Sequence, residues 1–68
     1  MTENILYKIP GQLVVRAIQT LPDAVSCRDN TLQVCVNDGH LAAKITFLRF
    51  HDRRLHRWFW VAEEAKEL

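Results

Sequence analysis

The chain has 68 residues, of which 49% are hydrophobic and 25% are charged, and its net charge is +1. This length allows one domain, and the composition is typical of a globular protein rather than a disordered one. No apolar run approaches the roughly 20 residues that span a bilayer, and the polar, acidic start of the chain is unlike a signal peptide. We therefore expect a single small domain over residues 1–68 in the cytoplasm, with no membrane contact.

The first 21 residues predict an N-terminal arm followed by one short helix. Residues 1–10 contain enough apolar side chains for a short strand or a packed arm, and Pro10-Gly11 interrupts this segment. Within residues 11–21 the apolar positions follow the spacing i, i+1, i+4, i+5 and i+8, which places them along one side of an α-helix. Pro22 ends the helix, because proline cannot continue the hydrogen-bond ladder. The apolar positions are Leu13, Val14, Ala17, Ile18 and Leu21.

From residue 24 the apolar period changes to two, which predicts an antiparallel meander over residues 24–62. Residues 24–28 are a possible short first strand, so the sheet is expected to have three or four strands. Residues 31–37 alternate between apolar and polar side chains, and Asp38-Gly39 follows as a strong signal for a two-residue hairpin turn. The pairs that this turn predicts are Asn37 with His40, Val36 with Leu41, Val34 with Ala43 and Leu32 with Ile45.

A second hairpin joins the strand that continues through Phe50 to a third strand over residues 55–62. The predicted turn is Arg53-Arg54, although arginine is unfavourable in the turns that require positive φ, so this register is less firmly specified. Residues 63–68 are polar and are expected to fray or to form one helical turn. The pairs that this turn predicts are Phe47 with Trp60, Leu48 with Phe59 and Arg49 with Trp58.

The predicted sheet carries apolar side chains on both faces, and one helix cannot cover both. A ten-residue helix is about 15 Å long, which is enough for one face only. Either the N-terminal arm covers the second face, or that face binds a second copy of the chain or another protein. This pattern favours a non-enzymatic protein-interaction module, either a homodimer or an inhibitor-like or adaptor-like accessory protein. The predicted interface residues are Leu48, Phe50, Trp58, Phe59 and Val61.

Positive charge is concentrated in residues 44–57, which carry five basic side chains against Asp52 alone, a net charge of +4. Arginines neutralise phosphates, and aromatic rings stack on unpaired bases, so the alternative function is binding of single-stranded nucleic acid or RNA through hairpin 49–60. Two other interpretations stay open. Tryptophan and arginine are also enriched at protein interfaces, and a basic loop also protects a sheet from aggregation. The residues of the nucleic-acid alternative are Arg49, Arg53, Arg54, Arg57, Trp58 and Trp60.

The cysteines and histidines do not predict a metal site. Cys27 and Cys35 are too few for a disulfide framework and are more typical of small hydrophobic residues in a reducing compartment. Neither they nor the three histidines have the spacing of metal ligands. We therefore expect no metal and no cofactor. The histidines are His40, His51 and His56.

The sequence also contains no pattern that predicts catalysis. It has no glycine-rich phosphate loop and no nucleophile elbow. His51 and Asp52 could act as an acid/base pair, but adjacent residues of a strand point to opposite faces of the sheet. We expect no catalytic residues and no enzyme activity. The predicted fold class is α+β, with the short N-terminal helix packed on one face of a three- or four-stranded antiparallel β-meander.

Overall fold

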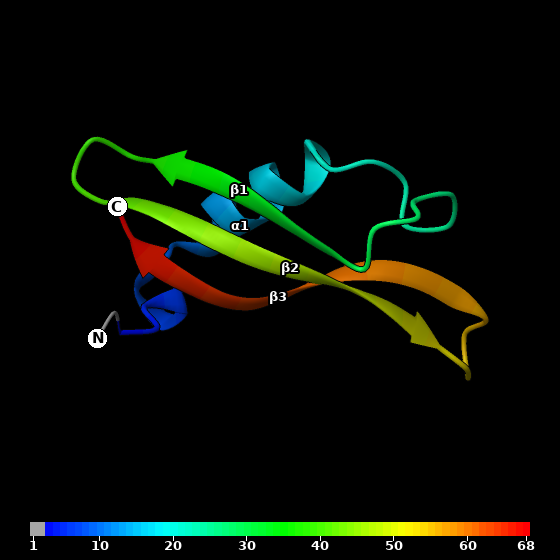
Figure 1. Ribbon diagram of the computed structural model, residues 1–68. Coiled ribbons are helices and arrows are strands. Elements are labelled where there is room, and N and C mark those ends of the chain that lie inside the picture. The colour runs from blue at the N-terminus through cyan, green and yellow to red at the C-terminus, as the bar shows by residue number, and fades with distance from the viewer. Residues whose placement is uncertain (1–2) are drawn as a thin grey trace.

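The computed structural model describes residues 3–68, and within this range it contains two short helices followed by three strands (Figure 1). The strands form one antiparallel sheet in the order β1-β2-β3. The predicted α+β class is therefore confirmed, and the described residues form three strands. The elements are the 3-10 helix η1 (Leu6–Lys8), the α-helix α1 (Gly11–Gln19) and the strands β1 (Thr31–Asn37), β2 (Ala42–Asp52) and β3 (Arg57–Glu67).

Helix α1 begins directly after Pro10 and ends two residues before the predicted boundary. The carbonyl of Pro10 accepts hydrogen bonds from the N–H groups of Leu13 and Val14, at 2.9 and 3.3 Å. At the other end, the backbone N–H and the hydroxyl of Thr20 both donate to the carbonyl of Ala17, at 3.1 and 2.7 Å. A hydroxyl that bonds back to the helix in this way competes with further helical hydrogen bonds. The buried Ala17 side chain anchors the apolar side of the helix to the core.

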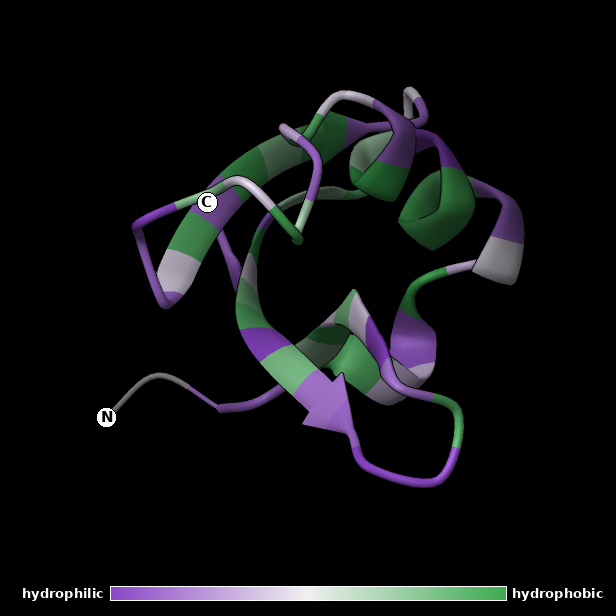
Figure 2. Cartoon of the chain, turned by 90° about the vertical axis from the view of Figure 1, so that its right-hand side faces the viewer, coloured by the Kyte–Doolittle hydropathy of each residue, from purple (hydrophilic) through white to green (hydrophobic). Residues whose placement is uncertain are grey.

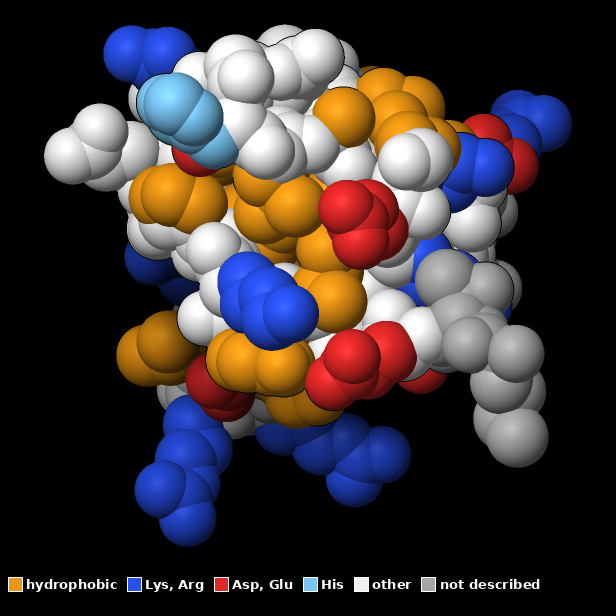
Figure 3. Space-filling view, turned by 90° about the vertical axis from the view of Figure 1, so that its left-hand side faces the viewer, with side chains coloured by type: hydrophobic (Ala, Val, Ile, Leu, Met, Phe, Trp, Pro, Cys, Tyr) orange, Lys and Arg blue, Asp and Glu red, His pale blue; other side chains and the backbone are white. Residues whose placement is uncertain are grey.

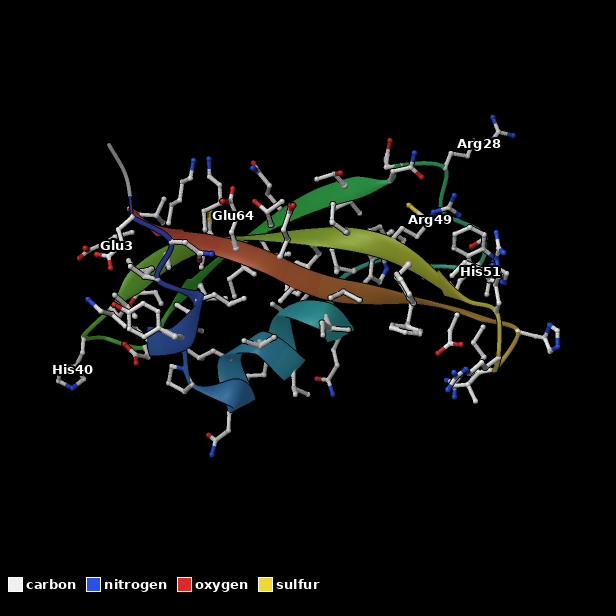
Figure 4. All side chains as sticks on the ribbon, turned by 90° about the horizontal axis from the view of Figure 1, so that it is seen from below. Glu3, Arg28, His40, Arg49, His51 and Glu64 are labelled. Atoms are coloured by element: carbon white, nitrogen blue, oxygen red, sulfur yellow. The ribbon has the colours of Figure 1, made fainter. Side chains whose placement is uncertain are left out.

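The hydrophobic core lies between one face of the sheet and the two helices. Both helices lie on the same side of the sheet (Figure 4), which curves part of the way around α1 (Figure 2). Ile5 and Ile9 of the N-terminal arm are buried in this core, and the N–H of Ile5 donates to the carbonyl of Ala65 at 2.7 Å. Residues 3–10 of the arm therefore form a packed segment without a strand, and they lie on the face that α1 also covers. The buried core residues are Ile5, Ile9, Ala17, Ala24, Ala43, Ile45, Phe47, Trp60 and Ala65.

The first hairpin turns one residue later than predicted, which corrects the register of β1 against β2. The backbone N–H of Asp38 donates to the carbonyl of Leu41 at 3.2 Å, so the tightest part of the turn is Gly39-His40. Each residue of β1 pairs with the β2 residue two positions beyond its predicted partner. A register shift of two leaves every side chain on its predicted face. The observed pairs are Leu32 with Phe47, Val34 with Ile45, Val36 with Ala43 and Asn37 with Ala42.

The side chain of Asp38 explains the shifted turn. A two-residue turn at Asp38-Gly39 requires positive φ at both positions, and only Gly39 adopts it, with φ of 93°. The Asp38 carboxylate instead accepts the backbone N–H groups of His40 and Leu41, at 2.9 and 2.7 Å. These two backbone hydrogen bonds, His40 first, lower the pKa of Asp38 below its ordinary value of 3.8.

This pKa shift predicts how the stability of the fold depends on pH. A lowered pKa means that the folded chain prefers ionised Asp38. The stabilisation of the fold by this carboxylate is therefore fully present above pH 3.8, and it is lost as the pH falls through the folded-state pKa of Asp38. We expect Asp38→Ala to lower the thermal midpoint at pH 7, and we expect the difference from wild type to narrow in acid. Circular dichroism melts over a pH series measure this. Asp29→Ala is the control. A difference in thermal midpoint between Asp38→Ala and wild type that persists unchanged in acid would contradict the prediction.

The second hairpin is corrected in the same way. Residues 53–56 join β2 to β3 instead of Arg53-Arg54 alone, and His56 takes positive φ of 52°. One carboxylate oxygen of Asp52 accepts two N–H groups inside the loop, at 2.9 and 3.2 Å, as Asp38 does in the first hairpin. The side chains again keep their predicted faces. The observed pairs are Phe47 with Ala62, Leu48 with Val61 and Arg49 with Trp60.

Two further predictions about strands are wrong. Residues 24–28 form a turn instead of a short strand, because the backbone carbonyl and the carboxylate of Asp23 accept N–H groups from the residues that follow it. Residues 63–67 continue β3 instead of fraying. A bulge at Glu63 shifts the register by one, and Ala65 then becomes fully buried in the core. Among residues 3–68 no helix has the length and apolar character needed to cross a membrane.

Candidate functional site

The face of the sheet opposite α1, here called the open face, is covered by no helix or strand of residues 3–68. Glu64 projects from this side of the sheet, away from both helices (Figure 4). Strand pairing places residue 48 beside residue 61 and residue 50 beside residue 59 on this face. The predicted second face is thus present in the structure, and residues 3–10 of the N-terminal arm do not cover it.

Four apolar residues form a compact block at the end of the open face near the second hairpin. Phe50 lies directly opposite Phe59, and Leu48 lies directly opposite Val61. The rings of Phe50 and Phe59 are tilted by 50° with their centroids 5.3 Å apart, a favourable aromatic geometry. Phe50 is 49% exposed and Val61 is 39% exposed. We call this block, which consists of Leu48, Phe50, Phe59 and Val61, the aromatic patch.

The other end of the open face is polar. Gln33 donates a hydrogen bond to the hydroxyl of Thr46 at 3.3 Å, and Lys66 lies 4.0 Å from Glu64. A shallow hollow of about 280 Å³ lies among these side chains. Figure 3 views the molecule from the end that carries both termini, and there acidic and basic side chains interrupt the apolar surface. The open face therefore changes from charged and polar at this end to apolar near the second hairpin.

Trp58 does not join the aromatic patch, which corrects its place in the predicted interface. It lies on the same face as Trp60, where its ring stacks on His51 at 4.6 Å between centroids. The guanidinium carbon of Arg49 lies 4.2 Å from the centroid of the same ring, within the range of a cation–π interaction. The side chains of Arg49 and His51 therefore both contact Trp58. The cause is the two-residue periodicity of β3, because Trp58 and Phe59 are adjacent and point to opposite faces.

Arg49 and Trp60 hold the connection between α1 and β1 against the sheet. Arg49 donates from Nη1 to the carbonyl of Ala24 and from Nη2 to Oδ1 of Asn30, at 3.2 and 3.3 Å. The indole N–H of Trp60 donates to the carbonyl of Pro22 at 2.8 Å, and only 7% of Trp60 is exposed. These two members of the predicted nucleic-acid set therefore make intramolecular contacts, and sequence patterning contained no signal for them.

The three remaining arginines of that set are at the tip of the second hairpin, which extends past the helix layer (Figure 1). Arg53, Arg54 and Arg57 are exposed there, together with His56. We call these four residues the basic tip. Leu55, in the same loop, is 60% exposed. The structure thus separates the three arginines at the tip from both tryptophans, which lie on the core side together with Arg49.

The residues considered for metal binding and catalysis are not brought together. Within residues 3–68 there is no group of three or more histidine, cysteine, aspartate or glutamate side chains that could hold a metal ion. Cys27 is half-buried and Cys35 is exposed, and both are free thiols. The ring of His51 stacks on Trp58, whereas the carboxylate of Asp52 accepts hydrogen bonds in its loop. The two residues that were considered as an acid/base pair and rejected therefore engage different groups.

Comparison of this chain with protein-family models, with curated proteins and with solved structures finds no match.

Proposed function

We propose that this chain is a protein-interaction module without catalytic activity, and that it binds a partner protein through the aromatic patch. The observation that carries the proposal is the pairing of Phe50 with Phe59 and of Leu48 with Val61 on an open face. Two adjacent cross-strand pairs make the apolar surface contiguous. Contiguous exposed apolar surface, unlike single exposed residues, is characteristic of binding sites.

The chemistry of the patch favours a protein partner over a small molecule or a nucleic acid. Phenylalanine is enriched at protein interfaces, and apolar anchors surrounded by polar residues are the usual arrangement of interface hot spots. Asp52 and Arg57 form the next cross-strand pair on one side of the patch, and Thr46 and Glu64 form the pair that flanks it on the other. The patch thus has an apolar centre with a polar rim. Its residues lie on an open sheet surface and line neither of the two hollows of the described residues, which suits a macromolecular partner.

The small size of the chain supports the same proposal. A domain of about 60 residues buries only roughly 60% of the surface of its unfolded chain. Because Phe50 is about half exposed, the apolar area that this small fold buries is reduced further. A partner that covers the patch would stabilise the fold by mass action. An inhibitor-like or adaptor-like accessory protein is therefore the form of this function that we favour.

The test compares two arginine substitutions of exposed apolar residues. We expect Phe50→Arg to abolish partner binding, because it places a charge at the centre of the patch. Val25→Arg is the matched control, since Val25 is 65% exposed and lies outside the sheet. Proteins retained from a lysate by wild type and by Val25→Arg, but not by Phe50→Arg, are then purified, and their affinity is measured by calorimetry. The proposal fails if Phe50→Arg binds as tightly as wild type.

The basic tip favours a second candidate function, the binding of single-stranded nucleic acid. Its three exposed arginines would neutralise phosphates, but Trp60 is buried and Trp58 is already in contact with His51 and Arg49, so neither tryptophan is free to stack on bases. A labelled oligonucleotide separates the two functions. Binding that weakens steeply with salt, that is lost in Arg53→Ala/Arg54→Ala and that persists in Phe50→Arg would replace the protein-binding proposal with this candidate.

A further inference from the structure

The two outer edges of the sheet differ in how they are protected. On the outer edge of β3, both backbone polar groups of Ala65 are hydrogen-bonded. The N–H of Ile5 donates to its carbonyl, and the side-chain oxygen of Asn4 accepts its N–H at 3.0 Å. A bulge at Glu63 and several charged side chains further protect this strand. Bulges, charges and covering segments are the usual means by which proteins keep a sheet edge from pairing with another chain.

Within residues 3–68, strand β1 has none of these protections. Its sequence from Thr31 to Asn37 contains no charged residue, no proline and no glycine. Its pairing with β2 runs over seven successive residues without a bulge, and no described strand pairs with its outer edge. A regular, uncharged edge strand of this length is a template for the addition of another strand.

The register of β1 determines which backbone groups point outward. Hydrogen bonds from Asp38 to Leu41 and from Arg49 to Asn30 mark the two ends of the ladder between β1 and β2. In an antiparallel pair, hydrogen-bonded residues alternate with residues whose N–H and C=O groups point away from the partner strand. The backbone groups of Leu32, Val34 and Val36 therefore point toward β2. Those of the other four β1 residues, Thr31, Gln33, Cys35 and Asn37, point outward.

We propose that two copies of this chain pair antiparallel through their β1 strands to form a continuous six-stranded sheet. With Val34 opposite Val34 of the second copy, Thr31 lies opposite Asn37 and Gln33 opposite Cys35. All four outward-pointing residues then form hydrogen-bonded pairs, whereas a shift of two residues in either direction leaves one pair fewer. This arrangement is the isologous contact of a two-fold dimer, in which the same strand serves both copies.

The side chains of β1 are self-complementary in this register. On the core side, Leu32 lies opposite Val36 and Val34 lies opposite its own copy, so apolar side chains meet on that face. On the open face, Gln33 meets Cys35, so no charge lies opposite a like charge, and cross-strand pairs of these kinds are favourable or neutral. No cross-strand pair is therefore repulsive along the whole of β1 in this register. For this reason we assign a second copy of the chain as the partner of this edge.

A hollow beside the same edge would receive the added side chains. It has a volume of about 220 Å³ and lies between α1 and β1. In the dimer, the core-side residues Leu32 and Val34 of the second copy stand next to this hollow and bury its apolar surface. Because the two-fold axis is perpendicular to the sheet, both aromatic patches face the same side. The residues lining the hollow are Leu13, Arg16, Ala17, Thr20, Val34, Cys35, Val36 and Asn37.

Two double variants that differ at one residue test the dimer and its register together. Gln33→Glu/Cys35→Glu places glutamate opposite glutamate twice across the two-fold axis, whereas Gln33→Lys/Cys35→Glu places lysine opposite glutamate twice. Both variants keep a glutamate at position 35 opposite Lys44 of the same chain, so within one chain they differ only at residue 33. We expect light scattering to give a dimer for wild type and for the lysine variant. The two-glutamate variant should be a folded monomer or have a dissociation constant roughly tenfold or more higher.

A proline substitution checks the edge independently of charge. Cys35→Pro removes an N–H that points outward, whereas Val34→Pro removes one that bonds to β2. We expect Cys35→Pro to be a folded monomer by circular dichroism and light scattering, and Val34→Pro to unfold. Monomeric wild type, or equal dimerisation of the two double variants, would overturn the inference. A dimer lost in Phe50→Arg but kept in the two-glutamate variant would assign self-association to the aromatic patch instead.

Discussion

Phe47→Ala is expected to destabilise the protein by about 3–5 kcal/mol, because Phe47 is fully buried at the centre of the sheet. It lies between Leu32 on one neighbouring strand and Ala62 on the other, so its removal leaves a cavity lined by both hairpins. A domain of this size has a total stability of only roughly 3–10 kcal/mol. The variant should therefore be largely unfolded or melt far below wild type.

The matched control is Phe50→Ala, which removes the same ring from the other face of the same strand. Phe50 is about half exposed and contacts Phe59, so its loss should cost about 1 kcal/mol or less. Urea titrations followed by tryptophan fluorescence measure both changes. Similar midpoints for the two variants would mean that Phe47 is not the centre of the core.

The sequence was sufficient to predict the faces of the strands but not their registers. Alternation with a period of two assigns Phe47 to the core side and Phe50 to the other side. This assignment also holds when the strand pairing differs from the predicted register by an even number of residues. The register itself depends on turn geometry. At both hairpins an aspartate at the end of a strand, Asp38 or Asp52, accepts two backbone N–H groups and moves the turn along the chain. Asp38 and Gly39 are therefore both part of the turn. Asp38, however, precedes the two central residues, Gly39 and His40, instead of being one of them.

The candidate site was predictable to the same extent. Leu48, Phe50, Phe59 and Val61 follow from alternation alone, and the structure places all four on one face. The basic, aromatic composition of residues 49–60 did not reveal that Arg49 and Trp60 hold the connection from residue 21 to residue 30, since contacts distant in sequence leave no local pattern. Composition thus overestimated the groups available to nucleic acid, because composition does not distinguish a tip from a core.

The bulge at Glu63 has the largest structural consequence that sequence patterning missed. The acidic run that begins at Glu63 is typical of a solvated end, yet β3 continues to Glu67. The extra residue at Glu63 shifts the register by one, so Ala65 faces the core opposite Ile45. Its N–H and carbonyl also bind the N-terminal arm, at Asn4 and Ile5. Ala65 therefore links the last strand to the first segment of the chain.

Ala65→Lys tests this link, and we expect it to destabilise the fold by about 3 kcal/mol or more. The substitution places a long, charged side chain at a fully buried position and displaces the arm that packs over it. Glu67→Lys is the control, because it introduces the same residue two positions further along the same strand, where the side chain is exposed. Thermal melts should show a large loss for the first variant and little change for the second. If residues 63–68 were a frayed tail, both lysines would be tolerated equally, so equal melting temperatures would exclude the extended third strand.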